Sequence, residues 1–384
     1  MRKLIAGMRD NRGIALIIVL MVISVLTILV LDLHQSVRIN FYIASNLIEG
    51  IKASYLARSG IQVAAGALLK DVQENNVDSW HEDWYDFLAK AGMPGIPIAE
   101  GEMVLMEIHD ESGRFNLNGL VNKRGSVNQR NLDVFKQLLI AEEIEIEVAN
   151  AVVDWIDENN EALGGGGVED QAYGYGSNVD DMMSKNSRFE SLQEVRLVHG
   201  VTDEVWSKLE PLVTIYGDAA LNLNTTNTKV IKAVMKAIDE NADTTVADKI
   251  EEWRRQSGGE EGEGGEDESG FGFQSGEGNV FKGKNMATRL MELGMPRATA
   301  RKFVRYFGSS SHFFRVTVTA LVHGVQKNAV GIIFRHKKKV RIIYYRVAPG
   351  VSSEHMRKYN EQAQSGNTPQ PDAGGGMMNA LGFQ

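Results

Sequence analysis

The longest apolar run of the chain lies near its N-terminus. Ile14–Leu31 reads IALIIVLMVISVLTILVL, eighteen residues without a charged side chain. As a helix it spans roughly 27 Å, close to the hydrocarbon thickness of a bilayer. Basic residues gather in residues 1–13, before the run, and Asp32 follows it. The positive-inside rule therefore predicts a single-pass protein whose N-terminus is cytoplasmic and whose remaining roughly 350 residues lie across the membrane.

The helical pattern continues beyond the membrane run. Apolar residues recur every three to four positions as far as Val72, and proline is absent until Pro94. We predict one helix from Ile14 to about Val72, roughly 90 Å long. Its outer half carries an apolar stripe that has to pack on something. A plain signal anchor with a helical stalk is the alternative. The positions predicted to pack against other subunits are Ile18, Phe41, Leu47, Tyr55 and Leu56.

The rest of the chain mixes helical and strand patterns. An alternating apolar pattern predicts strands, and a period near 3.6 predicts helices. Strands are expected at Glu102–His109, Leu212–Tyr216, Ser311–His323, Val330–Phe334 and Val340–Val347, the last three as an antiparallel meander. A further short strand is expected within Asp110–Asn118, after a turn at Glu111–Gly113. Helices are expected at Gln129–Glu158, Phe189–Gly200, Thr228–Ile238, Val246–Arg255 and Ala287–Tyr306. A further helix is expected to begin directly after Thr202, which is its N-cap. The fold class is α+β.

Composition excludes several kinds of site. The chain has no cysteine, so it forms neither disulfides nor thiolate metal sites. Its formal net charge of −9 argues against nucleic acid as a partner, because phosphate binding depends on Lys and Arg. The sequence around Phe189–Thr202 looks like a helix-hairpin-helix, a motif that often binds DNA, but acidic residues flank it. A membrane-tethered DNA-binding protein of a DNA-uptake system is therefore the second hypothesis.

The densest polar cluster lies at the end of the helix predicted over Gln129–Glu158 and continues just beyond it. It contains Asp154, Asp157 and Asn159, and a run of four glycines separates it from Glu169 and Asp170. Asp154 and Asp157 are three residues apart, so on a helix they project from the same face. Carboxylate and amide oxygens suit a hard cation such as calcium. A solvated helix end is the alternative interpretation, and a carboxylate hydrolase is a third hypothesis for the protein.

The order of the motifs resembles a known family. A basic leader ends at Gly13, directly before Ile14, as in type IV prepilin signals. The turn Asp110–Asn118, the stretch Val153–Asp157, Gly167–Tyr173, Phe189–Gly200 and Leu221–Thr226 then follow in the order found in general secretion pathway protein K, the large minor pseudopilin of type II secretion. Most pilins have Glu as the fifth residue of the mature chain. Here that position is Ile18, and protein K characteristically lacks this Glu.

The resemblance implies a pseudopilin-type antiparallel sheet with a large inserted helical domain and bound calcium. Metal ligation is carried onto Asp157, Glu169 and Asp170, with Asp154 and Asn159 as further candidates. Cleavage after Gly13 and methylation at Ile14 are expected. The implied partners are the I and J minor pseudopilins, the major pseudopilin, prepilin peptidase and the inner-membrane secretion platform. The implied role is a non-enzymatic tip subunit that initiates and caps a periplasmic pseudopilus.

The remaining segments complete the expected organisation. The segment 256–279 has seven acidic and no basic residues and is predicted to be a solvated loop. Arg335–Lys339 is predicted to be a solvated hairpin turn. The expected domains are a leader at 1–13, the transmembrane and stalk helix at 14–75, the first part of the sheet at 76–120, the helical insertion at 121–255, the acidic loop at 256–279, a closing helix at 280–310, the last strands at 311–348 and a disordered tail at 349–384.

Overall fold

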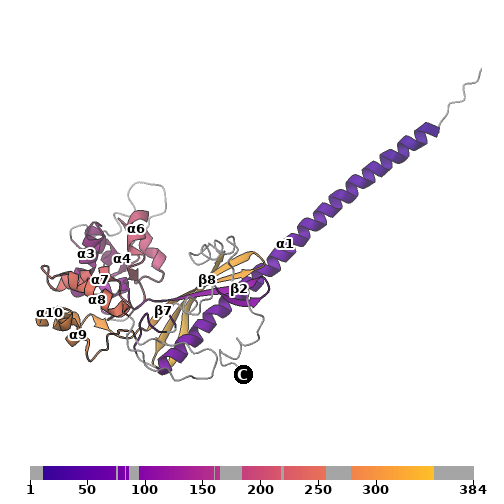
Figure 1. Ribbon diagram of the computed structural model, residues 1–384. Coiled ribbons are helices and arrows are strands. Elements are labelled where there is room, and N and C mark those ends of the chain that lie inside the picture. Colours follow the sequence, from indigo (N-terminus) through magenta and orange to yellow (C-terminus); the bar gives the residue numbers. More distant parts are fainter. Residues whose placement is uncertain are drawn as a thin grey trace, which may run out of the picture.

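One long helix dominates the computed structural model, which describes residues 12–74, 77–82, 84–85, 95–159, 161–164, 184–217, 220–256 and 278–349. Helix α1 (Arg12–Glu74) runs for 63 residues, and its first half projects away from the rest of the described chain (Figure 1). Within the apolar run, the hydroxyls of Ser24 and Thr27 donate to the carbonyls of Leu20 and Ile23, so these side chains expose no unsatisfied donor. The predicted single helix is confirmed.

The second half of α1 lies across an antiparallel sheet. The strand order is β1-β2-β7-β8-β9, and every neighbouring pair is antiparallel. The predicted meander is confirmed, although β8 extends further at both ends than predicted. Residues 96–99, for which the sequence analysis predicts no strand, form a short edge strand. The bounds are β1 (Ile96–Ala99), β2 (Glu102–Asp110), β7 (Phe313–Val322), β8 (Val325–His336) and β9 (Lys339–Pro349).

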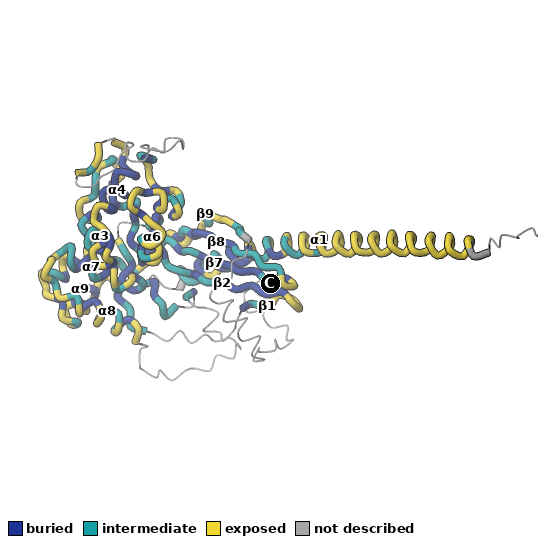
Figure 2. Tube along the Cα trace, turned by 90° about the horizontal axis from the view of Figure 1, so that it is seen from above, coloured by how far each residue is buried: buried dark blue, intermediate teal, exposed yellow. Residues whose placement is uncertain are grey.

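Small residues let α1 approach the sheet closely. Its inner face is formed by side chains spaced three or four residues apart, all at most 1% exposed: Ala53, Ala57, Ile61, Ala64 and Leu68. These pack on the alternating inward side chains of β7, such as Val316 and Val318. A Cβ atom on Gly60 would lie 2.6 Å from Val318 Cγ1, so glycine is required for this contact. Figure 2 shows the burial of α1 changing from exposed to intermediate or buried where the sheet begins.

The chain between β2 and β7 forms a helical unit with its own hydrophobic core, separate from the core between α1 and the sheet. The helices gather at the end of the molecule away from the projecting half of α1 (Figure 1). The elements of this unit are β3 (Phe115–Asn116), η1 (Leu117–Leu120), α3 (Gln129–Ala141), α4 (Glu147–Ile156), η2 (Leu192–Leu197), α6 (Asp203–Leu209), β4 (Val213–Thr214), β5 (Leu221–Asn222), α7 (Thr228–Ile238), α8 (Thr245–Arg255), α9 (Met286–Glu292), α10 (Arg297–Phe303) and β6 (Phe307–Gly308).

Local backbone conformations divide two of the helices that periodicity predicted as continuous. The predicted helix Gln129–Glu158 breaks between α3 and α4, where Glu143 has a φ of 56°. The predicted helix Ala287–Tyr306 breaks between α9 and α10, where Gly294 has a φ of 103° and Pro296 follows. Apolar spacing carries across a short break, so periodicity alone does not detect it.

The hairpin that resembles a DNA-binding motif differs from its prediction in one element. The stretch before Gly200 is the 3₁₀ helix η2, whose start is held by a reciprocal capping box between Ser191 and Glu194. Gly200 has a φ of 83°, and the side chain of Thr202 caps α6 as predicted. The hairpin is therefore present, with a 3₁₀ helix in place of its first α-helix.

Hydrogen bonds to Asp110 join the helical unit to the sheet. Asp110 is the last residue of β2, and its carboxylate accepts hydrogen bonds from Ser112 N at 2.7 Å and from the hydroxyls of Thr225 and Ser311, both at 2.5 Å. Asn222 of β5 donates from its Nδ2 atom to the same carboxylate at 3.3 Å. One side chain thus ties together the points where the chain enters and leaves the insertion.

Candidate assembly surface and acidic clusters

The projecting half of α1 presents an apolar surface to its surroundings. It is the helix among the described residues that is long and apolar enough to cross a membrane, by length and composition. Ile14 and Ile18 at its start are 58% and 55% exposed, and Phe41, Leu47 and Tyr55 beyond the membrane run are 70%, 63% and 67% exposed. Exposed apolar patches of this extent mark membrane or protein contacts. Gly13 lies within the first turn of the described helix.

Leu56 differs from the other residues predicted to pack against subunits. It is partly buried and packs against the hydrophobic core between α1 and the sheet. Tyr55, its neighbour in sequence, points away from that core and is exposed. The sheet therefore uses one side of this helical turn and leaves the other side open.

The predicted metal cluster lies at the C-terminal end of α4. Asp154 is fully buried, and both of its carboxylate oxygens accept a hydrogen bond from Leu163 N, at 3.0 and 3.1 Å. Asp157 is 2% exposed and forms the C-cap of α4. The Nδ2 atom of Asn159 donates to Asp157 Oδ2 at 2.7 Å, and Glu161 N donates to Asn159 Oδ1 at 2.7 Å. Glu169 and Asp170 lie outside the described residues.

A second acidic cluster, which the sequence analysis missed, lies beneath the end of α1. Carboxylate oxygens of Asp71, Asp78 and Glu82 lie within 4.8 Å of one another. Arg335 enters this cluster from β8, with its Nη1 atom 2.5 Å from Asp71 Oδ2 and its Nη2 atom paired with Asp78 Oδ1. The prediction that Arg335–Lys339 is a solvated turn is therefore wrong for Arg335, which is 3% exposed. The turn itself lies at Lys337 and Lys338.

Period-two alternation was the signal that could have found Arg335. It has the same parity along β8 as the buried residues Gly331 and Ile333. The adjoining run of lysines hid this alternation in the sequence.

Burial, with the neighbouring carboxylates of Asp71 and Asp78, raises the pKa of Glu82 to about 8.

Comparisons with known proteins find several similar proteins of one kind. A family profile described as "Type II secretion system (T2SS), protein K" matches residues 113–218. Type II secretion system protein K of Pseudomonas aeruginosa is 29% identical over 236 residues, which are 59% of this chain and 69% of that protein. The protein of the same name from Aeromonas hydrophila is 25% identical over 241 residues, covering 59% and 70% of the two chains.

The chain is similar to type II secretion system protein K both within residues 113–218 and beyond them. It is thus a minor pseudopilin, as the order of its motifs predicted. A chain from the crystal structure of the GspK-GspI-GspJ complex of enterotoxigenic Escherichia coli has a TM-score of 0.60 and 16% identity. The likeness covers 80% of this chain and 99% of that one. At this identity the likeness shows the fold, and the predicted α+β pseudopilin class is confirmed.

The surroundings of the hairpin do not favour the DNA-binding hypothesis. Asp203 and Glu204 at the start of α6 are 87% and 83% exposed at their side chains. The nearby cations Arg196 and Lys208 are already paired with these two carboxylates. A DNA phosphate approaching the hairpin would therefore meet acidic side chains, which repel it.

One carboxyl group has the two properties expected of a hydrolase's catalytic acid or base: a raised pKa and a place beside a cavity. Burial raises the pKa of Asp110 to about 6, and this residue borders a cavity. Its two oxygens, however, already accept the four hydrogen bonds that join the helical unit to the sheet. A general base needs a lone pair directed at a substrate or water, so these bonds assign Asp110 a structural role.

Proposed function

We propose that this minor pseudopilin occupies the tip of the type II secretion pseudopilus, where it initiates and caps assembly for the export of folded proteins across the outer membrane. The observation that carries the proposal is the exposed apolar surface of α1, together with Ile18 where most pilins have Glu. Sister helices would cover that surface. A subunit without the Glu does not need a subunit above it to supply an amino terminus.

The proposal includes a location and a set of partners. The N-terminus is cytoplasmic, α1 crosses the inner membrane and the head lies in the periplasm, in keeping with the basic residues that precede Ile14. The partners are the I and J minor pseudopilins, whose counterparts share a complex with the structural relative from E. coli, and the major pseudopilin. Prepilin peptidase and the inner-membrane platform act on the chain before assembly. The role requires no catalysis and no nucleic acid.

The N-terminal residue of the protein extracted from membranes tests this proposal. Mass spectrometry is expected to show a mature chain that begins at Ile14 and is N-methylated. Gly13→Leu should leave the leader attached, because it alters the cleavage site, whereas Gly7→Leu, within the same leader, should be processed normally. An intact Met1 on the wild-type protein, or a cut beyond Leu31, would overturn the pseudopilin assignment.

Bound calcium is the second part of the proposal, and the chemistry at the end of α4 fits it. The described candidates Asp154, Asp157 and Asn159 offer only oxygen ligands, and both carboxylates are buried. Asp154 already holds Leu163 N, so its role is to shape the loop. Asp157, with Glu169 and Asp170, would supply the carboxylates, and Asn159 orients Asp157. The ion, when bound, supplies the positive charge that joins this loop to the helix.

Calcium removal tests this site. Saturating calcium at about 100 times its Kd should stabilise the chain by roughly 2.7 kcal/mol. We expect EGTA to remove that stabilisation from the wild type and to have no effect on Asp157→Asn. Asp203→Asn, an exposed carboxylate on α6, is the matched control and should keep the calcium response. Equal thermal midpoints with calcium and with EGTA in the wild type would rule the site out.

A further inference from the structure

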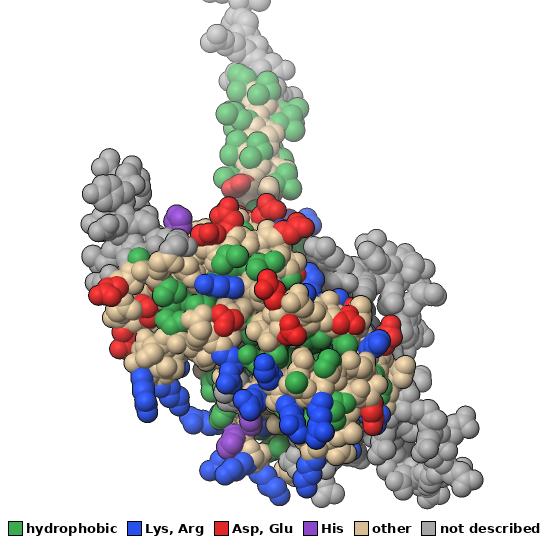
Figure 3. Space-filling model, turned by 90° about the vertical axis from the view of Figure 1, so that its left-hand side faces the viewer, with side chains coloured by type: hydrophobic (Ala, Val, Ile, Leu, Met, Phe, Trp, Pro, Cys, Tyr) green, Lys and Arg blue, Asp and Glu red, His purple; other side chains and the backbone are tan. Residues whose placement is uncertain are grey.

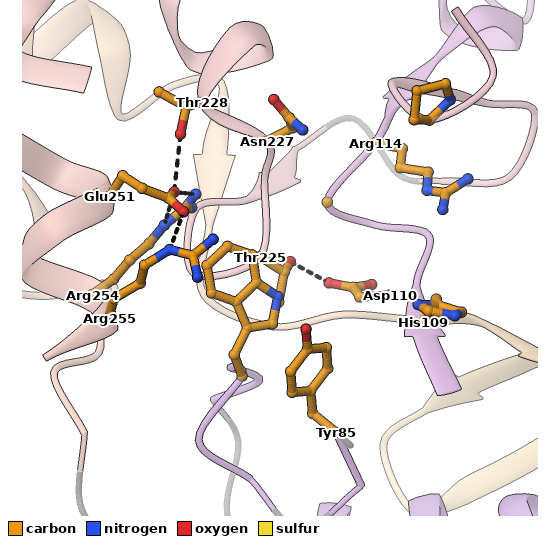
Figure 4. A pocket seen from close by; sticks show the side chains of 13 residues that line it. Tyr85, His109, Asp110, Arg114, Thr225, Asn227, Thr228, Glu251, Arg254 and Arg255 are labelled. Carbon is orange, nitrogen blue, oxygen red and sulfur yellow. Dashed lines mark hydrogen bonds and ion pairs between the residues drawn. The ribbon is translucent and has the colours of Figure 1, made fainter. Parts of the chain in front are cut away.

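A cavity of about 250 Å³ lies where the helical unit meets the sheet (Figure 4). Its walls come from five separate parts of the chain, one of which contributes Pro211 after α6. Trp80 and Tyr85 follow α1, Asp110 and Arg114 flank the turn after β2, Asn227 precedes α7, and Arg255 ends α8. A space of this size holds a side chain or a short peptide, and it is too small for a folded domain.

The charged groups of the cavity leave it with excess positive charge. Three arginines line it (Arg114, Arg254 and Arg255), against the carboxylates of Asp110 and Glu251. Glu251 is shared, since its Oε1 atom accepts from Arg255 Nε at 2.5 Å and its Oε2 atom from Arg254 Nε at 2.9 Å. With both carboxylates ionised the five groups sum to +1, because three positive charges face two negative ones. The cavity therefore favours an anion.

The hydrogen-bonding groups favour the same kind of ligand. Both acidic side chains have their oxygens engaged within the chain, Asp110 by the four donors described above and Glu251 by Thr228, Arg254 and Arg255. The side-chain oxygen of Asn227 accepts from Lys229 N at 2.9 Å. Among the described residues, no acceptor meets the Nη atoms of Arg255 or the Nδ2 atom of Asn227. The cavity therefore offers donors, and a ligand rich in acceptors complements it.

Neighbouring groups hold the arginine side chains in place before any ligand arrives. The guanidinium carbons of Arg254 and Arg255 lie 4.5 and 5.1 Å from the centre of the Trp80 ring. The buried Arg254 also donates from Nη1 to Leu223 O at 2.7 Å. The N-terminus of α7, at Asn227, adds the positive end of a helix dipole. A preorganised guanidinium loses little conformational freedom on binding, which favours affinity.

We propose that this cavity binds carboxylate side chains of an acidic polypeptide segment. Guanidinium groups match the planar carboxylate with two parallel hydrogen bonds, and a single negative charge balances the cavity. Arg114 and Arg255 stand on opposite sides of the cavity in Figure 4. Arg114 Nη1 already lies 3.7 Å from Oε1 of the buried Glu111 and donates to Glu210 O at 3.4 Å, so the Nη atoms of Arg255 are the donors that a carboxylate of the segment meets. The inference does not depend on the place of the chain in the pseudopilus.

Two sources of such a segment share this chemistry. One is another protein of the secretion pathway that carries an acidic stretch. The other is this chain itself, since residues 256–279 begin directly after Arg255 in the sequence and contain seven acidic residues. The test must distinguish the two.

The first experiment measures peptide binding to the purified full chain in detergent. The probe is a fluorescent peptide with the sequence of residues 258–269, which has six acidic side chains. We expect it to bind, and we expect the same peptide with amides in place of the carboxylates to bind at least tenfold more weakly. Arg255→Gln should weaken binding of the acidic peptide about tenfold or more. Arg196→Gln, an exposed arginine on η2, is the matched control and should leave binding unchanged.

Two further measurements test whether Arg255→Gln is still folded and which protein supplies the acidic segment. Arg255 is 66% exposed at its side chain, so its variant should keep the thermal midpoint of the wild type. Deleting residues 257–277 raises the affinity for the peptide if the chain's own segment occupies the cavity, and leaves it unchanged if the ligand comes from another protein. Either result supports the site. The proposed site is overturned if the peptide binds neither the full chain nor the chain without residues 257–277, or if Arg255→Gln binds the peptide as well as the wild type does. Neither outcome affects the separate prediction that the chain is cleaved after Gly13.

Discussion

Arg335 is the counter-ion of two carboxylates beneath the end of α1. The side chains of Arg335 and Asp78 are 4% and 3% exposed, and that of Asp71 is 12% exposed. Removing the arginine would leave two carboxylates in a poorly hydrated environment without their cation. We therefore expect Arg335→Ala to lower the free energy of unfolding by roughly 3–5 kcal/mol, measured by denaturant titration of the full chain in detergent.

A neighbouring cation provides the control for this prediction. Lys338 lies in the exposed turn of the same hairpin, so Lys338→Ala should change the free energy of unfolding by less than about 0.5 kcal/mol. A loss below about 1 kcal/mol for Arg335→Ala would show that the two carboxylates do not depend on the arginine.

Glu82 makes the stability of the chain depend on pH. Its pKa is raised from the usual 4.5 to about 8, chiefly by burial. Between these two values the folded chain holds a proton that the unfolded chain releases, so stability falls as pH rises, by at most about 1.4 kcal/mol per pH unit. Glu82→Gln keeps an oxygen that accepts from Trp84 Nε1. It should therefore reduce the loss of stability between about pH 5 and about pH 8.

The control for the pH prediction is an exposed carboxylate. Glu190 is 87% exposed at its side chain, and Glu190→Gln should retain the dependence of the wild type. Parallel pH curves for the wild type and Glu82→Gln would mean that Glu82 is ionised in the folded chain at neutral pH.

At the level of elements, the contact between α1 and the sheet depends on where its glycines lie. A Cβ atom at Gly60 would meet Val318 Cγ1 at 2.6 Å and Val104 Cγ1 at 3.3 Å, whereas nothing lies within 4 Å of one at Gly66. Gly60→Ala should therefore destabilise the chain by about 1–3 kcal/mol through overpacking. Gly66→Ala should stabilise it by about 0.5–1 kcal/mol, because alanine favours the helix.

Thermal unfolding of the two variants checks this difference in sign. Both substitutions add the same methyl group to the same helix, so any effect of alanine on helix propensity is common to them. If Gly60→Ala were as stable as Gly66→Ala, α1 would not be packed closely on β7.

The elements that the sequence predicted well are those with a strong local signal. The apolar period of α1, the alternation of β7 and the Thr202 cap each depend on neighbouring residues. The division between α3 and α4 was missed because the apolar spacing continues through Glu143 despite its φ of 56°. Strand β1 was missed because Pro97 is typical of a loop; an edge strand tolerates proline, since one side of its backbone has no partner strand to bond.

At the scale of the whole molecule, charge and apolar surface are distributed unevenly. The chain carries a net charge of −9, yet Lys and Arg gather over the lower part of the face in Figure 3, where Figure 1 places α9 and α10. The exposed bases of this region are Lys282, Lys284, Arg289, Arg297, Arg301, Lys302 and Arg305. The sequence revealed these bases and the apolar helix. It could not reveal the cavity at Trp80, because its walls come from segments far apart in the chain.

The apolar surface of α1 beyond the membrane run gives the last prediction. Phe41 and Leu47 are 70% and 63% exposed, so the chain's own fold does not depend on burying them. If sister helices cover them, a carboxylate placed there would be buried without a partner, at a cost of several kcal/mol. We expect Phe41→Glu and Leu47→Glu to abolish co-purification with the I and J minor pseudopilins of the same system.

The fold of these variants should be unaffected, and this distinguishes a lost interface from a lost structure. Thermal midpoints of the purified variants should match the wild type, because neither side chain contributes to the core between α1 and the sheet. Asn46→Asp adds a similar charge one residue from Leu47, at a position that is already polar, and should retain the partners. Retention of both partners by Phe41→Glu and Leu47→Glu would mean that assembly uses another face of the molecule, and the exposed stripe of α1 would then need a different occupant.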